Sequence, residues 1–215
     1  MRLTSLFSVA LAATTALAIP LVKPRTSDTN STVGPERGHL VIVGGNLKSG
    51  SIYQRIISLA GSYNASIVVV PTAAGYPHYD QNFSTAVTFR ELGATNVTVL
   101  HTYDPAVADT DEFVAPIKSA GAIFFGGGRP WRLVDAYAGT KTETAFNEVL
   151  DRGGVISGSS AGASIIGSFL ARGDTSGNDI LVGDHTVGFG YLKNAAIDQH
   201  VLVRNRHFDL SLIHI

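Results

Sequence analysis

The chain has no cysteine, and its 215 residues carry almost no excess charge of either sign. Without cysteine it has no disulfides, so its stability has to come from a buried core. The composition allows such a core, because 45% of the residues are hydrophobic and 15% are charged, as in an ordinary globular domain. A formal net charge of -1, with no clustered lysine or arginine, gives no electrostatic reason to expect nucleic acid as a partner.

Three motifs that bind cofactors or metals are also missing. Gly44 and Gly45 follow an apolar run, but the next glycine is Gly50, so the G-x-G-x-x-G pattern of dinucleotide sites is not formed. No glycine loop continues into Gly-Lys-Ser or Gly-Lys-Thr, which argues against a Walker-type phosphate loop. The seven histidines include no H-E-x-x-H or comparable ligand pair. The sequence therefore predicts neither a cofactor nor a metal.

The first 18 residues have the pattern of a secretory signal peptide. Met1 and Arg2 supply the positive start, an apolar stretch runs from Leu3 to Leu17, and Ala18 completes an A-x-A cleavage site. The apolar part is shorter than the roughly 20 residues that span a bilayer. We therefore expect cleavage after Ala18 and no membrane attachment afterwards.

Four glycosylation sequons fit the same secretory route and predict a secreted eukaryotic glycoprotein. They begin at Asn30, Asn64, Asn82 and Asn96. Residues 19–37 are polar and rich in turn-forming residues, so we expect a flexible leader there. Residues 38–215 are then expected to form a single domain.

Short apolar runs that alternate with amphipathic stretches predict an α/β fold. The runs cover residues 40–43, 67–70, 97–100, 122–125 and 155–156. Because they are continuous rather than alternating, they are typical of parallel strands covered on both faces. Helical spacing between them indicates repeated βαβ units, and hence a three-layer α/β/α sandwich with a mostly parallel sheet. Ligands in such sheets bind beyond the carboxyl ends of the strands, where the loops 44–46, 71–73, 126–128 and 158–162 are expected to converge.

Residues 158–162, GSSAG, follow one of these runs and match the G-x-S-x-G pattern of a nucleophile elbow. Such a turn lifts the hydroxyl of its middle serine, here Ser160, clear of the sheet edge. The N–H of Ala161, and one from Gly127 or Gly128, are candidate donors for an oxyanion. On this motif alone, a tight strand-to-helix turn or a phosphate-binding turn is an equally good interpretation. His200, in the strand-like segment 197–200, is a candidate base.

Several motifs occur in an order that resembles the cyanophycinase and dipeptidase E family of serine peptidases, and specifically a secreted fungal-like member. They are GGG at 126–128, Arg132-Leu133, GSSAGAS at 158–164, Arg172-Gly173-Asp174, GFGYL at 188–192, and Asp198-Gln199-His200 followed by Arg204 and Arg206. The resemblance runs from about His39 to Leu210. It implies a fold similar to class I glutamine amidotransferases.

The resemblance also implies roles for particular residues. Ser160 would be the nucleophile and His200 the general base, with Asp174, or alternatively Asp179, as the acidic third member that orients the imidazole. The segment around His200 would line the substrate pocket. Its candidate binding residues are Asp198, Gln199, Arg204 and Arg206. The guanidinium groups of the two arginines suit carboxylate recognition.

Three features depart from the family pattern. Pro130 stands where cyanophycinases tend to carry a glutamine, and Asp209 stands where a third arginine is usual. The chain ends at Ile215, where family members continue with further strands and a helix. We therefore expect an altered pocket, a form truncated at its C-terminus, and poor behaviour as a soluble monomer because a sheet edge would be uncovered.

The sequence thus predicts a secreted serine-type peptidase, an exopeptidase or dipeptidase acting near an aspartyl residue through an acyl-enzyme on Ser160. Its expected partner is a peptide or dipeptide, and a homodimer stays open. One alternative is a non-catalytic, amidotransferase-like binding module or an inactive form. Another is an α/β-hydrolase esterase, which is disfavoured because only 55 residues follow Ser160.

Overall fold

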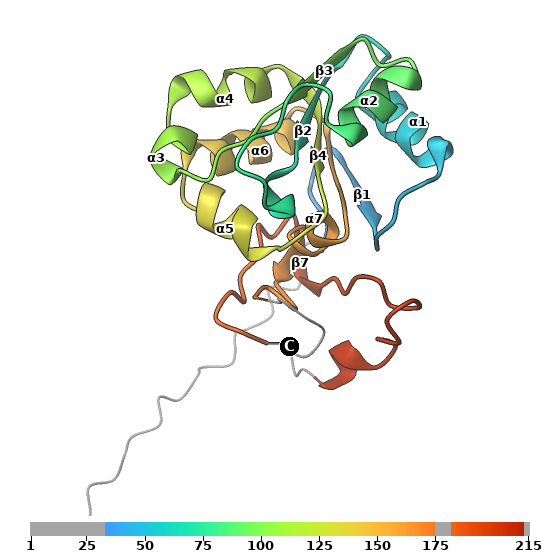
Figure 1. Ribbon diagram of the computed structural model, residues 1–215, viewed down its shortest axis with the longest axis vertical. Helices are drawn as coiled ribbons and strands as arrows, with labels where there is room; N and C mark the ends of the chain where they lie inside the picture. The colour runs from blue at the N-terminus through green and yellow to red at the C-terminus, as the bar shows by residue number, and fades with distance from the viewer. Residues whose placement is uncertain (1–32, 175–181, 213–215) are drawn as a thin grey trace, which may run out of the picture. The chain divides into compact units, whose positions relative to one another are not determined.

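A computed structural model describes residues 33–174 and 182–212, so the predicted signal segment 1–18, Asn30 and Asp179 lie outside the described residues. A five-stranded sheet forms the centre of the structure (Figure 1). Its strands are β1 (His39–Val43), β2 (Ser66–Val70), β3 (Asn96–Val99), β4 (Ala120–Phe125) and β5 (Val155–Ser159). They are all parallel, in the order β1-β5-β4-β2-β3. The predicted parallel α/β sheet is confirmed.

Helices cover both faces of this sheet, which makes the three layers. One face carries α1 (Gly50–Leu59) and α2 (Ser84–Glu91); the other carries α3 (Pro105–Ala108), α4 (Asp111–Lys118), α5 (Trp131–Tyr137) and α6 (Lys141–Asp151). Side chains of a strand point alternately to the two faces. In β2, Ile67 and Val69 pack with α1 and α2, while Val68 and Val70 pack on the opposite side with Tyr137 of α5.

Short polar side chains fix where several of the helices on the second face begin. Asp104 accepts a hydrogen bond from the Ala106 N–H at the start of α3, and Thr110 accepts one from the Phe113 N–H at the start of α4. Such caps satisfy N–H groups that have no partner inside the helix. Thr140 caps the start of α6 in the same way, by accepting a hydrogen bond from the Thr142 N–H.

Two of the five strands differ from the expectation that all are covered on both faces. In the described part of the chain, β1 and β3 are the edges of the sheet, because each pairs with one neighbour. The burial of β3 alternates, and β1 is exposed or half-buried throughout, with Ile42 39% exposed. An apolar run in the sequence identifies a strand but does not say whether it lies at an edge, since that depends on the strand order.

The segment that follows β5 lies at the carboxyl edge of the sheet. It contains α7 (Ala161–Ser164), a second, two-stranded sheet of β6 (Gly167–Phe169) and β7 (Leu192–Ala196), and the short helix η2 (Asp209–Leu212). The expectation of a strand over 197–200 is wrong, because β7 ends at Ala196. The chain is instead held by separate bonds: Ser164 Oγ donates to the Ile197 carbonyl at 3.1 Å, and the His200 N–H donates to the Gly44 carbonyl at 2.9 Å.

No helix in residues 33–174 and 182–212 combines the length and apolar character that a membrane span needs.

The exposed edge of β1 gives a testable prediction. A lysine on an edge strand discourages pairing with another chain, so Ile42→Lys should slow aggregation several-fold and leave the melting temperature nearly unchanged. Light scattering and thermal denaturation measure the two effects. Ile156→Lys is the matched control, because Ile156 is fully buried in β5, an inner strand of the sheet, and its replacement should prevent folding. Aggregation of Ile42→Lys at the parent rate would contradict the prediction.

Candidate active site

Ser160 sits on a strained turn between β5 and α7. Its backbone has φ +58° and ψ -118°, a region that residues other than glycine rarely adopt, and its N–H donates to the Val43 carbonyl at 3.0 Å. The glycines on either side are required by close contacts. A Cβ on Gly158 would lie 2.1 Å from the Gly162 carbonyl oxygen, and one on Gly162 would lie 2.0 Å from the Phe125 carbonyl oxygen. The turn therefore has the geometry expected of a nucleophile elbow.

Two side chains from the 197–200 segment meet at the hydroxyl of Ser160. Ser160 Oγ lies 2.8 Å from His200 Nε2 and also donates to the side-chain oxygen Oε1 of Gln199. A hydroxyl has a single hydrogen to donate, and the amide of a glutamine can be turned so that its NH₂ faces the oxygen. In that alternative orientation Gln199 would donate to Oγ, and the hydroxyl hydrogen would be left for His200.

The ring of His200 rests against the backbone that follows β1. The His200 N–H is bonded to the Gly44 carbonyl, and a Cβ on Gly45 would lie only 2.2 Å from Cε1 of the ring. Gly45 therefore provides the space that the imidazole occupies. Sequence reasoning considered these two glycines for a dinucleotide site and missed this role; their position after the first strand was the available signal.

The surroundings of His200 favour the neutral form of its imidazole. Burial lowers the pKa of His200 below its ordinary value, and the positive charges of Arg204 and Arg206 lower it further, while the charge of Asp198 acts in the opposite direction. A neutral imidazole can accept a proton from Ser160. The electrostatics and the distance therefore both suit a general base.

A buried cluster of charges lies behind this segment. Arg172 Nε lies 3.2 Å from Asp198 Oδ1, Arg206 Nη1 lies 3.6 Å from the same oxygen, and the three side chains are at most 4% exposed. Arg172 also pairs with Asp209, and Arg206 donates to the Gln199 carbonyl at 2.8 Å. The cluster thus fixes the backbone on both sides of Gln199, directly before His200, because Asp198 also accepts from the Gln199 N–H.

This cluster changes how several predicted binding residues are understood. Asp198 and Arg206 are engaged in ion pairs inside the protein, whereas Arg204 is exposed close to His200. Asp209, a departure from the family pattern, serves as a counter-charge for Arg172. The sequence did not indicate this pairing, because the partners come from distant segments.

Asp174 is not placed as the predicted third member of a triad. One of its oxygens accepts from the His185 N–H at 2.7 Å, and the other is bonded to His185 Nδ1. Its hydrogen bond with Asp174 raises the pKa of His185, whose Nε2 lies 3.0 Å from Asp135. Within residues 33–174 and 182–212, no carboxylate is hydrogen-bonded to the ring of His200. The sequence predicted that Asp174 is bonded to His200. Asp174 is instead bonded to a different histidine, His185.

The predicted oxyanion donors do not all lie against Ser160. Gly127 lies against it, since a Cβ there would be 3.3 Å from Ser160 Cβ. Gly128 has φ +144° and packs on the Ala73 carbonyl, where a Cβ would approach to 1.9 Å. Ala161 is the first residue of α7, and first-turn N–H groups have no partner within a helix. The structure thus brings Gly127 and Ala161 to the serine, with Gly128 supporting the loop.

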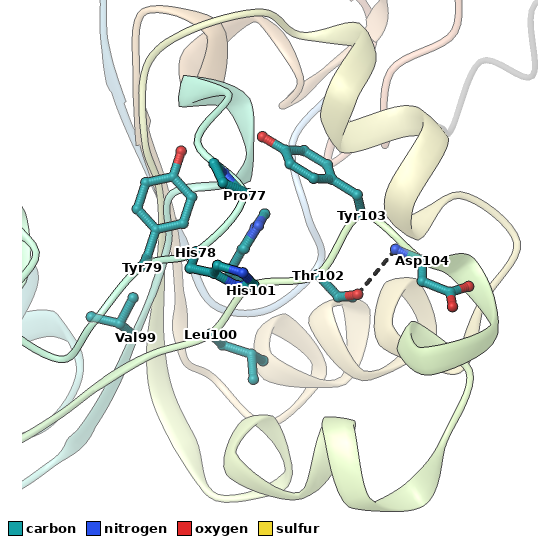
Figure 2. Close-up of a pocket in the computed structure, with 9 residues that line it drawn as sticks. All are labelled: Pro77, His78, Tyr79, Val99, Leu100, His101, Thr102, Tyr103 and Asp104. Atoms are coloured by element: carbon teal, nitrogen blue, oxygen red, sulfur yellow. Dashed lines mark hydrogen bonds between the residues drawn. The ribbon is translucent and has the colours of Figure 1, made fainter.

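A cavity of about 500 Å³ opens beyond β3, and sequence reasoning named none of its lining residues as part of a site. Figure 2 shows its aromatic walls: the ring of His101 stands edge-on to those of Tyr79 and Tyr103, at centroid distances of 4.7 and 4.6 Å. His101 Nδ1 lies 2.9 Å from Thr72 Oγ1, and burial lowers the pKa of His101. In the described part of the chain, no three histidine or acidic side chains are grouped to hold a metal ion.

Comparison with known proteins finds cyanophycinases among the proteins that this chain resembles. The chain is 29% identical over 177 residues to a cyanophycinase of Geminocystis herdmanii, covering 79% of this chain and 64% of the relative. It is 28% identical to a cyanophycinase of Nostoc, covering 78% and 58%. The chain therefore spans about three fifths of the length of these curated relatives.

A solved structure and a family model complete the comparison. The crystal structure of a peptidase from an acI-B1 Actinobacterium superposes with a TM-score of 0.62 at 26% identity, covering 83% of this chain and 74% of that chain. The model of peptidase family S51 matches residues 40–211. A match over most of the chain, with the serine elbow and its histidine inside it, shows that the chain belongs to peptidase family S51.

Proposed function

We propose that the protein is a serine-type peptidase, an exopeptidase or dipeptidase of cyanophycinase-like character, which forms an acyl-enzyme on Ser160. The observation that carries this proposal is the 2.8 Å contact between Ser160 Oγ and His200 Nε2 on a strained elbow. The membership of family S51, and the peptidase and cyanophycinases among the similar proteins, support it.

The residues would act in two half-reactions. His200 Nε2 takes the proton of Ser160 while Oγ bonds to the carbonyl carbon of the peptide, and backbone N–H groups of Ala161 and the Gly127 loop stabilise the oxyanion. His200 then gives the proton to the leaving amine as the C–N bond breaks. Water enters, loses a proton to His200, and hydrolyses the ester to release the acid and restore Ser160.

Substrate recognition is proposed to involve Arg204, because its exposed guanidinium lies close to His200. A guanidinium binds a carboxylate with two parallel hydrogen bonds, which fits a peptide with an aspartyl residue. Asp198 and Arg206 would act differently, by holding Gln199 and His200 in position from inside the protein.

A non-catalytic binding module is the second candidate function. It is favoured by one observation: in residues 33–174 and 182–212 no carboxylate orients the ring of His200, and the orienting group of a triad contributes strongly to rate. The esterase alternative has no comparable support, because the similar proteins are named as peptidase and cyanophycinases.

Secretion, glycosylation and the homodimer remain proposals as well. Asn64, Asn82 and Asn96 are exposed, as an acceptor for a glycan has to be, and all three stand in sequons. Treatment of protein secreted by a eukaryotic host with an endoglycosidase, followed by mass measurement, checks for the glycans.

The nucleophile assignment predicts that Ser160→Ala abolishes hydrolysis. If the catalytic residues act as a unit, kcat/KM for a cleavable peptide should fall by a factor on the order of 10⁶. A fluorophosphonate probe, which reacts with activated serines, should label the parent chain but not this variant. Ser51→Ala is the matched control, because Ser51 is exposed on α1 and its loss should change neither result. Hydrolysis that persists in Ser160→Ala would rule out this nucleophile, and an unlabelled parent chain would favour the binding module.

The lowered pKa of His200 predicts the pH dependence. Activity needs the neutral imidazole, and it is lost as the pH falls through the pKa of His200 in the folded protein. Because burial and the neighbouring arginines lower that pKa, the acid limb of kcat/KM should lie below 6.5, the ordinary value. Arg204→Gln removes one of these positive charges and should move the limb to higher pH. A limb above 6.5 in the parent chain, or one that Arg204→Gln shifts downward, would contradict the assignment.

The buried charge cluster predicts a large stability effect. Asp198→Asn leaves two buried guanidinium groups without this counter-charge, so the free energy of unfolding should fall by about 3 kcal/mol. Asp111→Asn is the control, because Asp111 pairs with Lys118 and Lys141 on the surface and its loss should cost less than about 1 kcal/mol. Urea denaturation followed by circular dichroism compares the two. Equal losses would show that the cluster does not hold the segment.

A further inference from the structure

A small cavity beside the glycine loop contains an arginine that has no acidic partner among the described residues. Its volume is about 280 Å³, and its lining residues are Gly75, Tyr103, Trp131, Arg132 and Asp135. Cavities for drug-sized ligands have volumes of about 300 to 1,000 Å³, so this one has room for a single side chain or a chain end. It is separate from the aromatic cavity of Figure 2, with which it shares Tyr103.

The guanidinium of Arg132 is held in place without being neutralised. Nη1 donates to the Ala73 carbonyl at 3.0 Å, and Cζ lies 5.1 Å from the ring centroid of Trp131. In residues 33–174 and 182–212 no aspartate or glutamate forms an ion pair with Arg132. The one acidic residue that lines the cavity, Asp135, is bonded to His185 instead. A guanidinium has five N–H donors, so several remain for a ligand.

The cavity is connected to Ser160 by a short series of contacts. The Ala73 carbonyl that accepts from Arg132 also accepts from the Arg129 N–H at 2.8 Å, and Gly128 packs against it. Gly127, the preceding residue, lies against Ser160. The glycine loop therefore contacts both Ser160 and the Ala73 carbonyl that holds the guanidinium.

We propose that Arg132 is a specificity-determining residue that binds a carboxylate group of the peptide substrate, with Trp131 and Tyr103 as the walls of the pocket. A planar guanidinium with free parallel donors matches the two oxygens of a carboxylate. The carboxylate has two possible sources, an acidic side chain or the end of a peptide chain. The proposal rests on the proposed peptidase function for its substrate, but the binding itself does not require catalysis.

The test uses Trp131, which is the sole tryptophan in the sequence and lies beside the guanidinium. Its fluorescence is followed in the otherwise intact chain carrying Ser160→Ala, so that no ligand is hydrolysed. Three probes are titrated: N-acetyl-aspartate amide has a side-chain carboxylate, N-acetyl-asparagine has a terminal carboxylate, and N-acetyl-asparagine amide has neither. One or both acids should give a saturable change, and the neutral probe should give none. The acid that binds more tightly identifies the source of the carboxylate.

Variants of Arg132 make the test specific. Arg132→Gln should weaken binding of the acid roughly ten- to a hundredfold, the loss expected for hydrogen bonds to a charged group. Arg132→Lys keeps the charge but not the planar pair of donors, so an intermediate affinity is expected; it also carries the test if Arg132→Gln fails to fold. Arg55→Gln, on the exposed side of α1, is the control and should bind like the parent.

The outcomes separate this proposal from the proposed function. Acid-selective binding that depends on Arg132 supports the pocket even if no peptide is hydrolysed by the parent chain. Equal responses to the neutral probe, no response to any probe, or unchanged affinity in both Arg132 variants would overturn it. If affinity is unchanged in both Arg132 variants but the parent chain hydrolyses peptides, the peptidase assignment stands. The substrate carboxylate would then be bound by residues other than Arg132.

Discussion

The pairing of β1 with β5 is the constraint on which the candidate site depends. Val43 lies opposite Ser159 in the register of these strands, and the Val43 carbonyl accepts from the Ser160 N–H. The next residues after β1 hold His200 through the Gly44 carbonyl and the open space at Gly45. One strand end thus positions both the serine and the histidine, although they belong to different segments. A shift of this pairing by one residue would separate them.

The sheet and the elbow could be predicted from the sequence because their signals are local. Continuous apolar runs separated by helical patterns identify parallel strands, and the small residues around Ser160 identify a tight turn. His200 was found by its place in a known order of motifs. Two predictions were wrong: that residues 197–200 form a strand, and that β1 is covered on both faces. Both features depend on contacts between distant parts of the chain.

The acidic residues show the limit of sequence reasoning most clearly. Asp174 was expected beside His200, and it is bonded to His185. Asp198 was expected to face substrate, and it lies in a buried ion cluster. The type of residue was informative in both cases, but the choice of partner is decided by packing. The lack of an acidic partner for Arg132 among the described residues has the same origin, because Asp135, which lines the same cavity, is bonded to His185.

The long separation in sequence between β1 and the segments that it joins has a consequence for folding. Pairing of residues far apart in the chain is entropically costly and forms slowly, whereas helices and neighbouring strands form from local contacts. β1 emerges first during synthesis and pairs only with β5, the last strand of the sheet in the described part of the chain. Because Ser160 and His200 are both held by the end of β1, a partly folded chain in which β1 is still unpaired carries no assembled site.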